Sequence, residues 1–339
     1  MKKQYIILFL ILCIVGFLLG YKYIWSAKKN VTENKSPGEL SSLSKIVVES
    51  STPSSNKWLY TYVIEKEGLG KKYGLDIEWK DISTSEGPRA LLANDVNIAF
   101  INPFATIRAN TSSDKKMKIF GFAYNINYAC YALESSNINT VNDLKGKTIV
   151  TSSKGSTGYA VLDLLITNMG YNLEQDFKIL SVPLAASVVA LEKNEAAATC
   201  VTPYNIVPLD DSIKLKTIIN LNDLWFKEIS KIQPYTGIGA LEEWLKDHTK
   251  EALAFRNAWN DAGRYINDHP ELFQLQDVRE NLKIVSDQDV NDYIGAFKTM
   301  SSPIWDASVV AGTNEYLSKM SEFNKSSEEN SFDIYTLYN

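Results

Sequence analysis

The chain has 339 residues, a formal net charge of −5 and 45% hydrophobic residues. This length accommodates two domains of ordinary size, and the composition excludes a disordered or collagen-like chain. The 35 basic residues are outnumbered by 40 acidic ones and are not clustered, which argues against a nucleic-acid partner.

The N-terminus predicts a membrane-associated or exported protein. Lys2 and Lys3 precede an almost wholly apolar run at residues 5–20. Trp25 occupies the position where a signal peptidase requires a small side chain, so cleavage there fits poorly. We therefore expect residues 1–27 to be a membrane anchor or signal segment that leaves the rest of the chain on the extracytoplasmic face of the membrane.

A polar stretch with Pro37 and Gly38 follows, and residues 28–43 are predicted to be a flexible tether. Beyond it, short apolar strands alternate with helical patterns, which indicates an α/β fold of parallel βαβ units. Strands are predicted at 45–49, 75–79, 96–101, 118–123, 148–151, 178–182, 197–201 and 215–219. Helices are predicted at 57–66, 88–93, 105–109, 157–169 and 186–193, and then at 242–268, 287–299 and 308–323.

The strand-to-helix junctions are the predicted location of the functional site. In open parallel sheets, ligands bind beyond the carboxyl ends of the strands, where helices begin. Five junctions share polar or turn-forming residues, which predicts a polar cleft; they lie at 50–57, 83–89, 102–106, 152–157 and 183–187. At Gly155, Ser156 and Thr157, the free N–H groups of a helix start can cradle an anionic or strongly polar ligand. An ordinary helix cap by Ser156 or Thr157 is the alternative.

Cysteine and histidine usage predicts neither a disulfide framework nor a metal site. Cys13 lies in the N-terminal apolar run, and Cys130 and Cys200 lie in strand-like segments, where small buried residues are expected. His248 and His269 are expected at the surface or at helix ends. No Walker A sequence or nucleophile elbow is present, and no cofactor is predicted.

Five segments resemble the substrate-binding proteins of ABC importers, in the group that binds sulfonates, nitrate, taurine and thiamine-precursor pyrimidines. They cover most of residues 45–300 and occur in the expected order. The segments are EKEGLGKKYGLDIEW, ALLANDVNIAFINP, VNDLKGKTIVTSSKGST, SVVALEKNEAAATCVTPY and LEEWLKDHTKEALAFRNAWNDAGRYINDHPELF.

This resemblance implies a two-lobe type II periplasmic-binding-protein fold with a hinge. Lobe one would comprise residues 44–124 and 237–339, and lobe two residues 125–236, with hinge strands at 126–133 and 234–241. The implied function is to trap a small-molecule ligand between the lobes, without catalysis, and to deliver it to an ABC permease and its ATPase.

One departure from the family pattern concerns the ligand. Relatives often carry an acidic residue just before the proline of the TPY segment, where it is available to an ammonium group. Thr202 precedes Pro203 here, which disfavours an amino-sulfonate such as taurine.

The predicted ligand contacts come from both lobes. Trp58 and Phe104 can either stack on a planar ligand or pack in the core, and these alternatives stay open. The aromatic residues and the small number of arginines favour a small polar or anionic organic ligand, sulfonate-like or heteroaromatic. The predicted contacts are Ser54, Ser55, Asn56, Trp58, Asn102, Phe104, Tyr124, Gly155, Ser156, Thr157, Thr202 and Tyr204.

Two other functions remain as alternatives. A membrane-tethered sensor would report the ligand to a separate receptor. The pyrimidine-precursor synthase of yeast shares the implied fold, but it relies on a cysteine-rich motif with histidine, and no such motif occurs in this sequence.

Overall fold

The computed structural model describes residues 42–50, 57–154, 156–182, 184–207, 213–300, 305–318 and 334–336. Residues 43–339 form one unit by their internal contacts. The predicted anchor and all but the last two residues of the predicted tether lie outside the described residues, as does the predicted loop contact at Ser54, Ser55 and Asn56. Among the residues that are described, no helix has the length and apolar character needed to cross a membrane.

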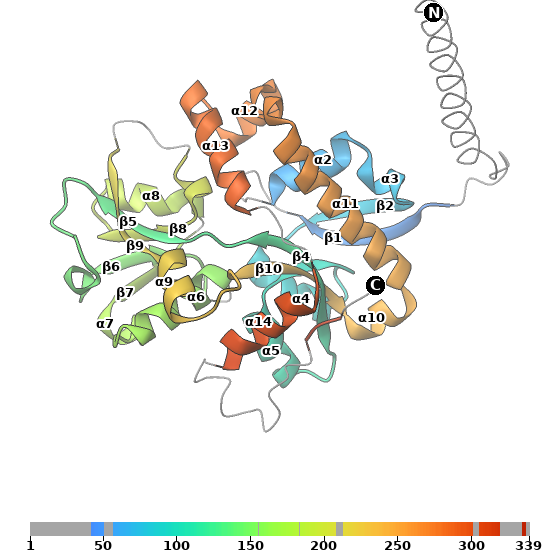
Figure 1. Cartoon of the computed structure of the whole chain (residues 1–339), viewed down its shortest axis with the longest axis horizontal. Coiled ribbons are helices and arrows are strands. Elements are labelled where there is room, and N and C mark those ends of the chain that lie inside the picture. Colours follow the sequence, from blue (N-terminus) through green and yellow to red (C-terminus); the bar gives the residue numbers. More distant parts are fainter. Residues whose placement is uncertain are drawn as a thin grey trace, which may run out of the picture. The chain divides into compact units, whose positions relative to one another are not determined.

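The first half of the chain alternates strands and helices, as predicted (Figure 1). The elements are β1 (Ser44–Ser50), α2 (Trp58–Lys66), α3 (Leu69–Lys72), β2 (Leu75–Asp81), η1 (Thr84–Glu86), α4 (Gly87–Leu92), β3 (Ala99–Ile101), α5 (Pro103–Ser112), β4 (Met117–Asn125), β5 (Ala129–Leu133), η2 (Val141–Leu144), β6 (Thr148–Thr151), α6 (Thr157–Asn168), α7 (Leu173–Asp176) and β7 (Lys178–Ser181).

The second half begins with the same alternation and ends in helices. The elements are α8 (Leu184–Glu192), β8 (Ala198–Val201), η3 (Pro203–Asn205), β9 (Leu215–Asn220), α9 (Leu221–Glu228), β10 (Tyr235–Leu241), α10 (Glu242–Asp247), α11 (Thr249–Asp268), η4 (Pro270–Gln274), α12 (Gln276–Leu282), α13 (Asp287–Met300) and α14 (Ala307–Ser318). The helix predicted at 242–268 is interrupted at His248, whose backbone leaves the helical region and whose ring stacks on Trp244 at 4.8 Å.

The described strands form three sheets; a single bridge joins two of them into a first group of strands, and the third sheet has the corresponding strand order. In the first group, β1 pairs in parallel with β2, a parallel bridge from Val48 to Ile98 leads to β3, and β10 pairs antiparallel with both β3 and β4. The third sheet has the order β7-β6-β8-β5-β9. There, β6 is parallel to β7 and β8, and β5 is antiparallel to β8 and β9. In each set of five, four strands therefore run in one direction, and β10 or β5, the fourth strand in the order, runs in the opposite direction.

The chain crosses between the two sets of strands twice. Residues 126–128 connect β4 to β5, and α9 with the segment after it connects β9 to β10. The two crossings lie side by side, because the backbone N–H of Ile126 donates to the carbonyl of Pro234 at 2.7 Å (Figure 1). Residues 126–128 lie within the first segment expected to form a hinge, and the second expected segment begins at residue 234, where the other crossing ends.

Helix α11 covers part of the first group of strands through one apolar face. Its buried residues recur at helical spacing, as in an amphipathic helix. The Trp259 ring stacks on Tyr60 at 4.6 Å and lies 4.4 Å from the ring of Phe100, and its indole N–H donates to the carbonyl of Ala123 at 3.0 Å. The long amphipathic segment of the sequence thus becomes a core element that fixes β3 and β4.

The two strand cysteines form a disulfide, which corrects the expectation that no disulfide is present. Cys130 of β5 and Cys200 of β8 are opposite each other in the antiparallel pairing, and both are buried as predicted. They are separated by 70 residues in the sequence. The pattern of strands alone does not reveal that β5 inserts next to β8, and this insertion creates the bond.

Candidate functional site

The junction after β1 contains a buried ion pair that the sequence analysis missed. Lys57 and Glu49 pair with no exposed side-chain surface on either residue. Glu49 also accepts a hydrogen bond from the backbone N–H of Phe100 at 2.8 Å, and the Lys57 ammonium lies 4.7 Å from the centre of the Phe100 ring. Burial raises the pKa of Glu49, although Lys57 opposes the shift. A glutamate at the end of an otherwise apolar strand was the available signal.

Gly87 makes room for this pair at the start of α4. A Cβ at Gly87 would lie 2.8 Å from Oε2 of Glu49. The junctions after β1 and β2 therefore meet at the Glu49 carboxylate. The pair fixes the base of both loops, because a buried charge that lost its partner would be strongly destabilising.

Trp58 begins α2 beside this pair and is half-buried. Its ring stacks on that of Tyr62 at 5.3 Å. Tyr62 in turn donates a hydrogen bond from its hydroxyl to Asp277 at 2.5 Å. Tyr62 therefore packs on Trp58 at the surface of α2, and a ligand contact by Trp58 stays a prediction.

The junction after β3 places its two predicted residues in different surroundings. Asn102 caps α5 by accepting a hydrogen bond from the N–H of Ala105 at 2.8 Å, and it is buried. The Phe104 side chain is also buried, and its ring lies 5.7 Å from that of Tyr316 in α14. In this structure Phe104 adopts the packing alternative.

The junction between β6 and α6 has the cap geometry given above as the alternative, and ligand binding there stays a prediction. Gly155 lies outside the described residues, but the Ser156 hydroxyl caps α6 by accepting from the N–H of Tyr159 at 3.2 Å. Its oxygen also lies 2.6 Å from the Ser152 hydroxyl, which lies 2.9 Å from the hydroxyl of Tyr128. Burial raises the pKa of the Tyr128 phenol, which keeps it protonated. Three hydroxyls therefore form a chain at the start of α6.

Tyr128 reaches this chain by lying across the first turn of α6. A Cβ on Gly158 would lie 2.4 Å from Cζ of Tyr128 and 2.7 Å from its hydroxyl oxygen. Because Tyr128 belongs to the first crossing, the helix start contacts the predicted hinge directly. Tyr128 lies in the segment expected to form the first hinge strand, but the sequence did not predict its contact with this junction.

A second contact joins α6 to the other crossing strand. The hydroxyl of Thr157 lies 3.4 Å from that of Thr236 in β10, and both residues are buried. Thr236 pairs in register with Tyr124 of β4. The structure thus brings together the predicted residues Tyr124, Ser156 and Thr157, and adds Thr236 and Tyr128.

The junction after β8 faces α13. The Thr202 hydroxyl donates to Oδ1 of Asn205 at 2.7 Å, which stabilises the turn of η3. The Tyr204 ring is buried edge-on against Tyr293 at 5.1 Å and Phe297 at 5.6 Å. Burial also raises the pKa of Tyr204 well above its ordinary value. Thr202 therefore stabilises the turn of η3, and Tyr204 packs η3 against α13.

Several charged or polar residues near the junctions have partners elsewhere. Arg89 pairs with Glu86 at 2.6 Å on the surface. Lys154 pairs with Glu174, which also accepts a hydrogen bond from the Tyr159 hydroxyl at 2.9 Å. Within the described parts of the chain, no group of three His, Cys, Asp or Glu side chains is arranged to hold a metal ion.

The family model described as NMT1/THI5 like matches residues 56–272. No curated protein matches the chain. Three solved structures show the extent of the fold similarity. A protein from Bordetella bronchiseptica RB50 has a TM-score of 0.71 and 17% sequence identity, over 87% of this chain and 95% of that one.

The names of the other two proteins state what those proteins bind. The alkanesulfonate-binding protein SsuA from Xanthomonas axonopodis pv. citri, bound to MOPS, has a TM-score of 0.63 and 14% identity over 80% of this chain and 90% of that one. The periplasmic nitrate-binding protein NrtA from Synechocystis PCC 6803 has a TM-score of 0.56 and 15% identity over 74% of this chain and 69% of that one. The fold is that of periplasmic binding proteins, as predicted.

Proposed function

Because the chain belongs to the NMT1/THI5-like family, we propose that it is the extracytoplasmic solute-binding protein of an ABC importer. It traps a small polar or anionic organic molecule between its two lobes and delivers it to a permease driven by an ATPase. We take residues 44–124 with 237–339 as one lobe and residues 125–236 as the other. The fold shared with sulfonate- and nitrate-binding proteins supports this role.

The observation that carries the proposal is the contact of the α6 start with both crossing segments. Tyr128 of the first crossing contacts the Ser152 hydroxyl, which contacts Ser156, and Thr236, at the start of β10 just after the second crossing, contacts Thr157. A ligand bound at the helix start and touching the opposite lobe would stabilise the closed arrangement through these contacts.

The chemistry of the α6 start favours a ligand rich in oxygen acceptors. Unpaired N–H groups and the positive end of the helix dipole attract an anionic or strongly polar group. Sulfonate and nitrate are anions of this kind, and a polar heteroaromatic ring can use the same donors. The Ser156 hydroxyl is already used as a helix cap and has another hydroxyl as its neighbour, which supports binding in preference to nucleophilic catalysis.

The disulfide supports an extracytoplasmic location independently of the family. Disulfides persist in oxidising compartments and are rare in the reducing cytosol. The bond between Cys130 and Cys200 is therefore expected in a protein that functions outside the cytoplasm.

A ligand screen tests the proposal. The full chain, purified in detergent, is heated with alkanesulfonates, nitrate, pyrimidines and small carboxylates, and its melting temperature is recorded. A ligand present at about 100 times its Kd stabilises the folded state by roughly 2.7 kcal/mol. We expect one class to raise the melting temperature without being converted. Chemical turnover of a compound, or no response in a cooperatively folded protein, contradicts the proposal.

A further inference from the structure

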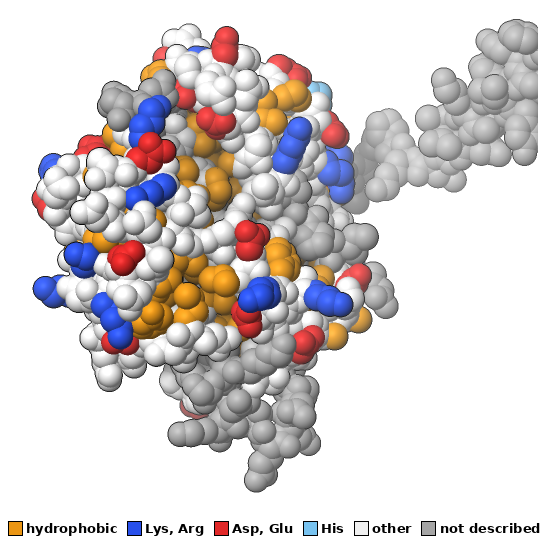
Figure 2. All heavy atoms as spheres, turned by 60° about the vertical axis from the view of Figure 1, so that its left-hand side comes forward, with side chains coloured by type: hydrophobic (Ala, Val, Ile, Leu, Met, Phe, Trp, Pro, Cys, Tyr) orange, Lys and Arg blue, Asp and Glu red, His pale blue; other side chains and the backbone are white. Residues whose placement is uncertain are grey.

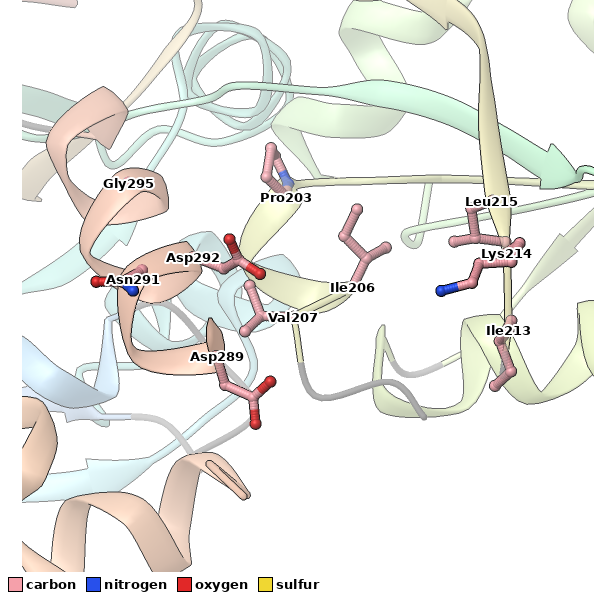
Figure 3. A pocket seen from close by; sticks show the side chains of 10 residues that line it. All are labelled: Pro203, Ile206, Val207, Ile213, Lys214, Leu215, Asp289, Asn291, Asp292 and Gly295. Atoms are coloured by element: carbon pink, nitrogen blue, oxygen red, sulfur yellow. The ribbon is translucent and has the colours of Figure 1, made fainter. Parts of the chain in front are cut away.

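A cavity lies between α13 and the segments that follow η3 (Figure 3). Its volume is about 430 Å³, which is within the range of small-molecule sites. Pro203 of η3 contributes to its wall, but none of the predicted ligand contacts lines it. The cavity therefore lies between the two proposed lobes, next to the predicted contacts Thr202 and Tyr204, and its lining does not include the hydroxyls at the α6 start.

One wall carries two carboxylates of α13. Figure 3 shows Asp289 and Asp292 on the side of the helix that faces Pro203 and Val207. Asp289 is held in place, because its Oδ2 accepts hydrogen bonds from the N–H groups of Val285 at 2.8 Å and Ser286 at 3.0 Å. Asp292 accepts from the side-chain amide of Gln288 at 2.8 Å. Both carboxylates are thus oriented before any ligand binds.

The opposite wall is aliphatic and carries one cation. Its four apolar side chains are half-buried: Ile206, Val207, Ile213 and Leu215. Lys214 extends from the start of β9 toward the same space (Figure 3). The cavity therefore presents negative charge, positive charge and an apolar surface to one occupant.

Gly295 keeps the α13 wall open. It lies in the middle of the helix, where glycine costs roughly 0.5–1 kcal/mol relative to alanine. A Cβ at Gly295 would have no atom within 4 Å, so no packing contact requires the glycine. The open space next to it is the cavity, which a larger side chain would enter.

We propose that this cavity binds a small zwitterion with an aliphatic body, of the kind represented by a free aliphatic amino acid. The ammonium group pairs with Asp292 and Asp289, the carboxylate pairs with Lys214, and the aliphatic part packs on the four apolar side chains. Asp292 and Lys214 are exposed, so each ion pair contributes little alone, and binding requires all three parts together.

Calorimetry on the full chain tests this site with three probes. L-leucine carries all three features, isoamylamine lacks the carboxylate, and 4-methylpentanoate lacks the ammonium group. We expect leucine to bind, and each of the other two to bind at least about tenfold more weakly. No heat with leucine at concentrations up to about 10 mM, or equal affinity for all three probes, overturns the proposal.

Matched variants locate the binding. Asp292→Asn and Gly295→Leu are each expected to weaken leucine binding at least about tenfold, the first by removing charge and the second by filling the cavity. Asp287→Asn, on the same helix but outside the cavity lining, is the control and retains binding. Leucine binding that survives Asp292→Asn and Gly295→Leu overturns the assignment. Because Ser156 is not in the cavity lining, loss of solute binding in a Ser156 variant bears only on the proposed function.

Discussion

Two glycine-to-alanine substitutions in helices are expected to have opposite effects. Gly158 and Gly295 both lie in α-helices, where alanine is intrinsically favoured by up to about 1 kcal/mol. At Gly158 the new methyl group would lie 2.4 Å from Cζ of Tyr128, whereas at Gly295 it would meet no atom within 4 Å. Comparing the two substitutions therefore separates the effect of helix propensity on stability from the effect of the close contact with Tyr128.

The magnitudes follow from these contacts. Displacing a buried side chain by overpacking costs roughly 1–3 kcal/mol, and the lost hydrogen bond from Tyr128 to Ser152 adds about 1 kcal/mol. After the gain in helix propensity, Gly158→Ala should destabilise the fold by about 1–3 kcal/mol. Gly295→Ala should stabilise it by about 0.5–1 kcal/mol.

Urea unfolding of both variants and the parent protein measures the difference. Tyr128→Phe provides a further comparison, because it removes the hydroxyl but keeps the ring, and it should lose only about 1 kcal/mol. If Gly158→Ala proved as stabilising as Gly295→Ala, the contact of Tyr128 with α6 would be refuted, and with it the direct link between the helix start and the first crossing.

Three further predictions concern the ion pair, the disulfide and the start of α13. Lys57→Met should cost roughly 3–5 kcal/mol in urea unfolding because it leaves Glu49 buried without its cation, and adding Glu49→Leu should recover most of this loss; no recovery would show that the charges do not act as a pair. Reduction of the bond between Cys130 and Cys200 should cost about 2–4 kcal/mol, and an unchanged melting curve in reductant would argue against the bond. For Asp289, burial favours a higher pKa, but hydrogen bonds from two backbone N–H groups and a serine hydroxyl outweigh it and lower the pKa. Its stabilisation is therefore present above the ordinary carboxylate pKa of about 4 and is lost as the pH falls through the lowered value, so Asp289→Asn should flatten the acid limb of the stability profile.

The sequence predicted the positions of helices and strands better than the contacts between them. The strand expected at 45–49 is β1 at Ser44–Ser50, and the helix expected at 157–169 is α6 at Thr157–Asn168. Local periodicity and cap residues determine such elements, so a single sequence reveals them. The strand expected at 96–101 is shorter, since β3 begins only at Ala99, although Ile98 still bridges to Val48 of β1.

Contacts between distant segments could not be predicted from local patterns. The disulfide depends on β5 lying between β8 and β9, which follows from how the chain returns through the sheet. The Glu49 pair depends on the approach of α4 at Gly87, and the Tyr128 contact depends on Gly158. Ser156, by contrast, was identified as a possible cap because its role involves only the next three residues.

The most direct test of the proposed solute site compares two helix caps. Asp replaces Ser as a cap with little loss, so Ser156→Asp should keep α6 intact while placing a carboxylate at the proposed site. Asn172 accepts hydrogen bonds from backbone N–H groups at the cap of α7. Asn172→Asp therefore introduces a carboxylate at a different helix cap and serves as the control.

The measurement is calorimetric titration of both variants with the anionic ligand found in the screen. If the ligand binds at the start of α6, Ser156→Asp should weaken binding by at least about a hundredfold, while Asn172→Asp should bind like the parent protein. Unchanged affinity in a folded Ser156→Asp variant would contradict the central claim that the ligand binds at the start of α6.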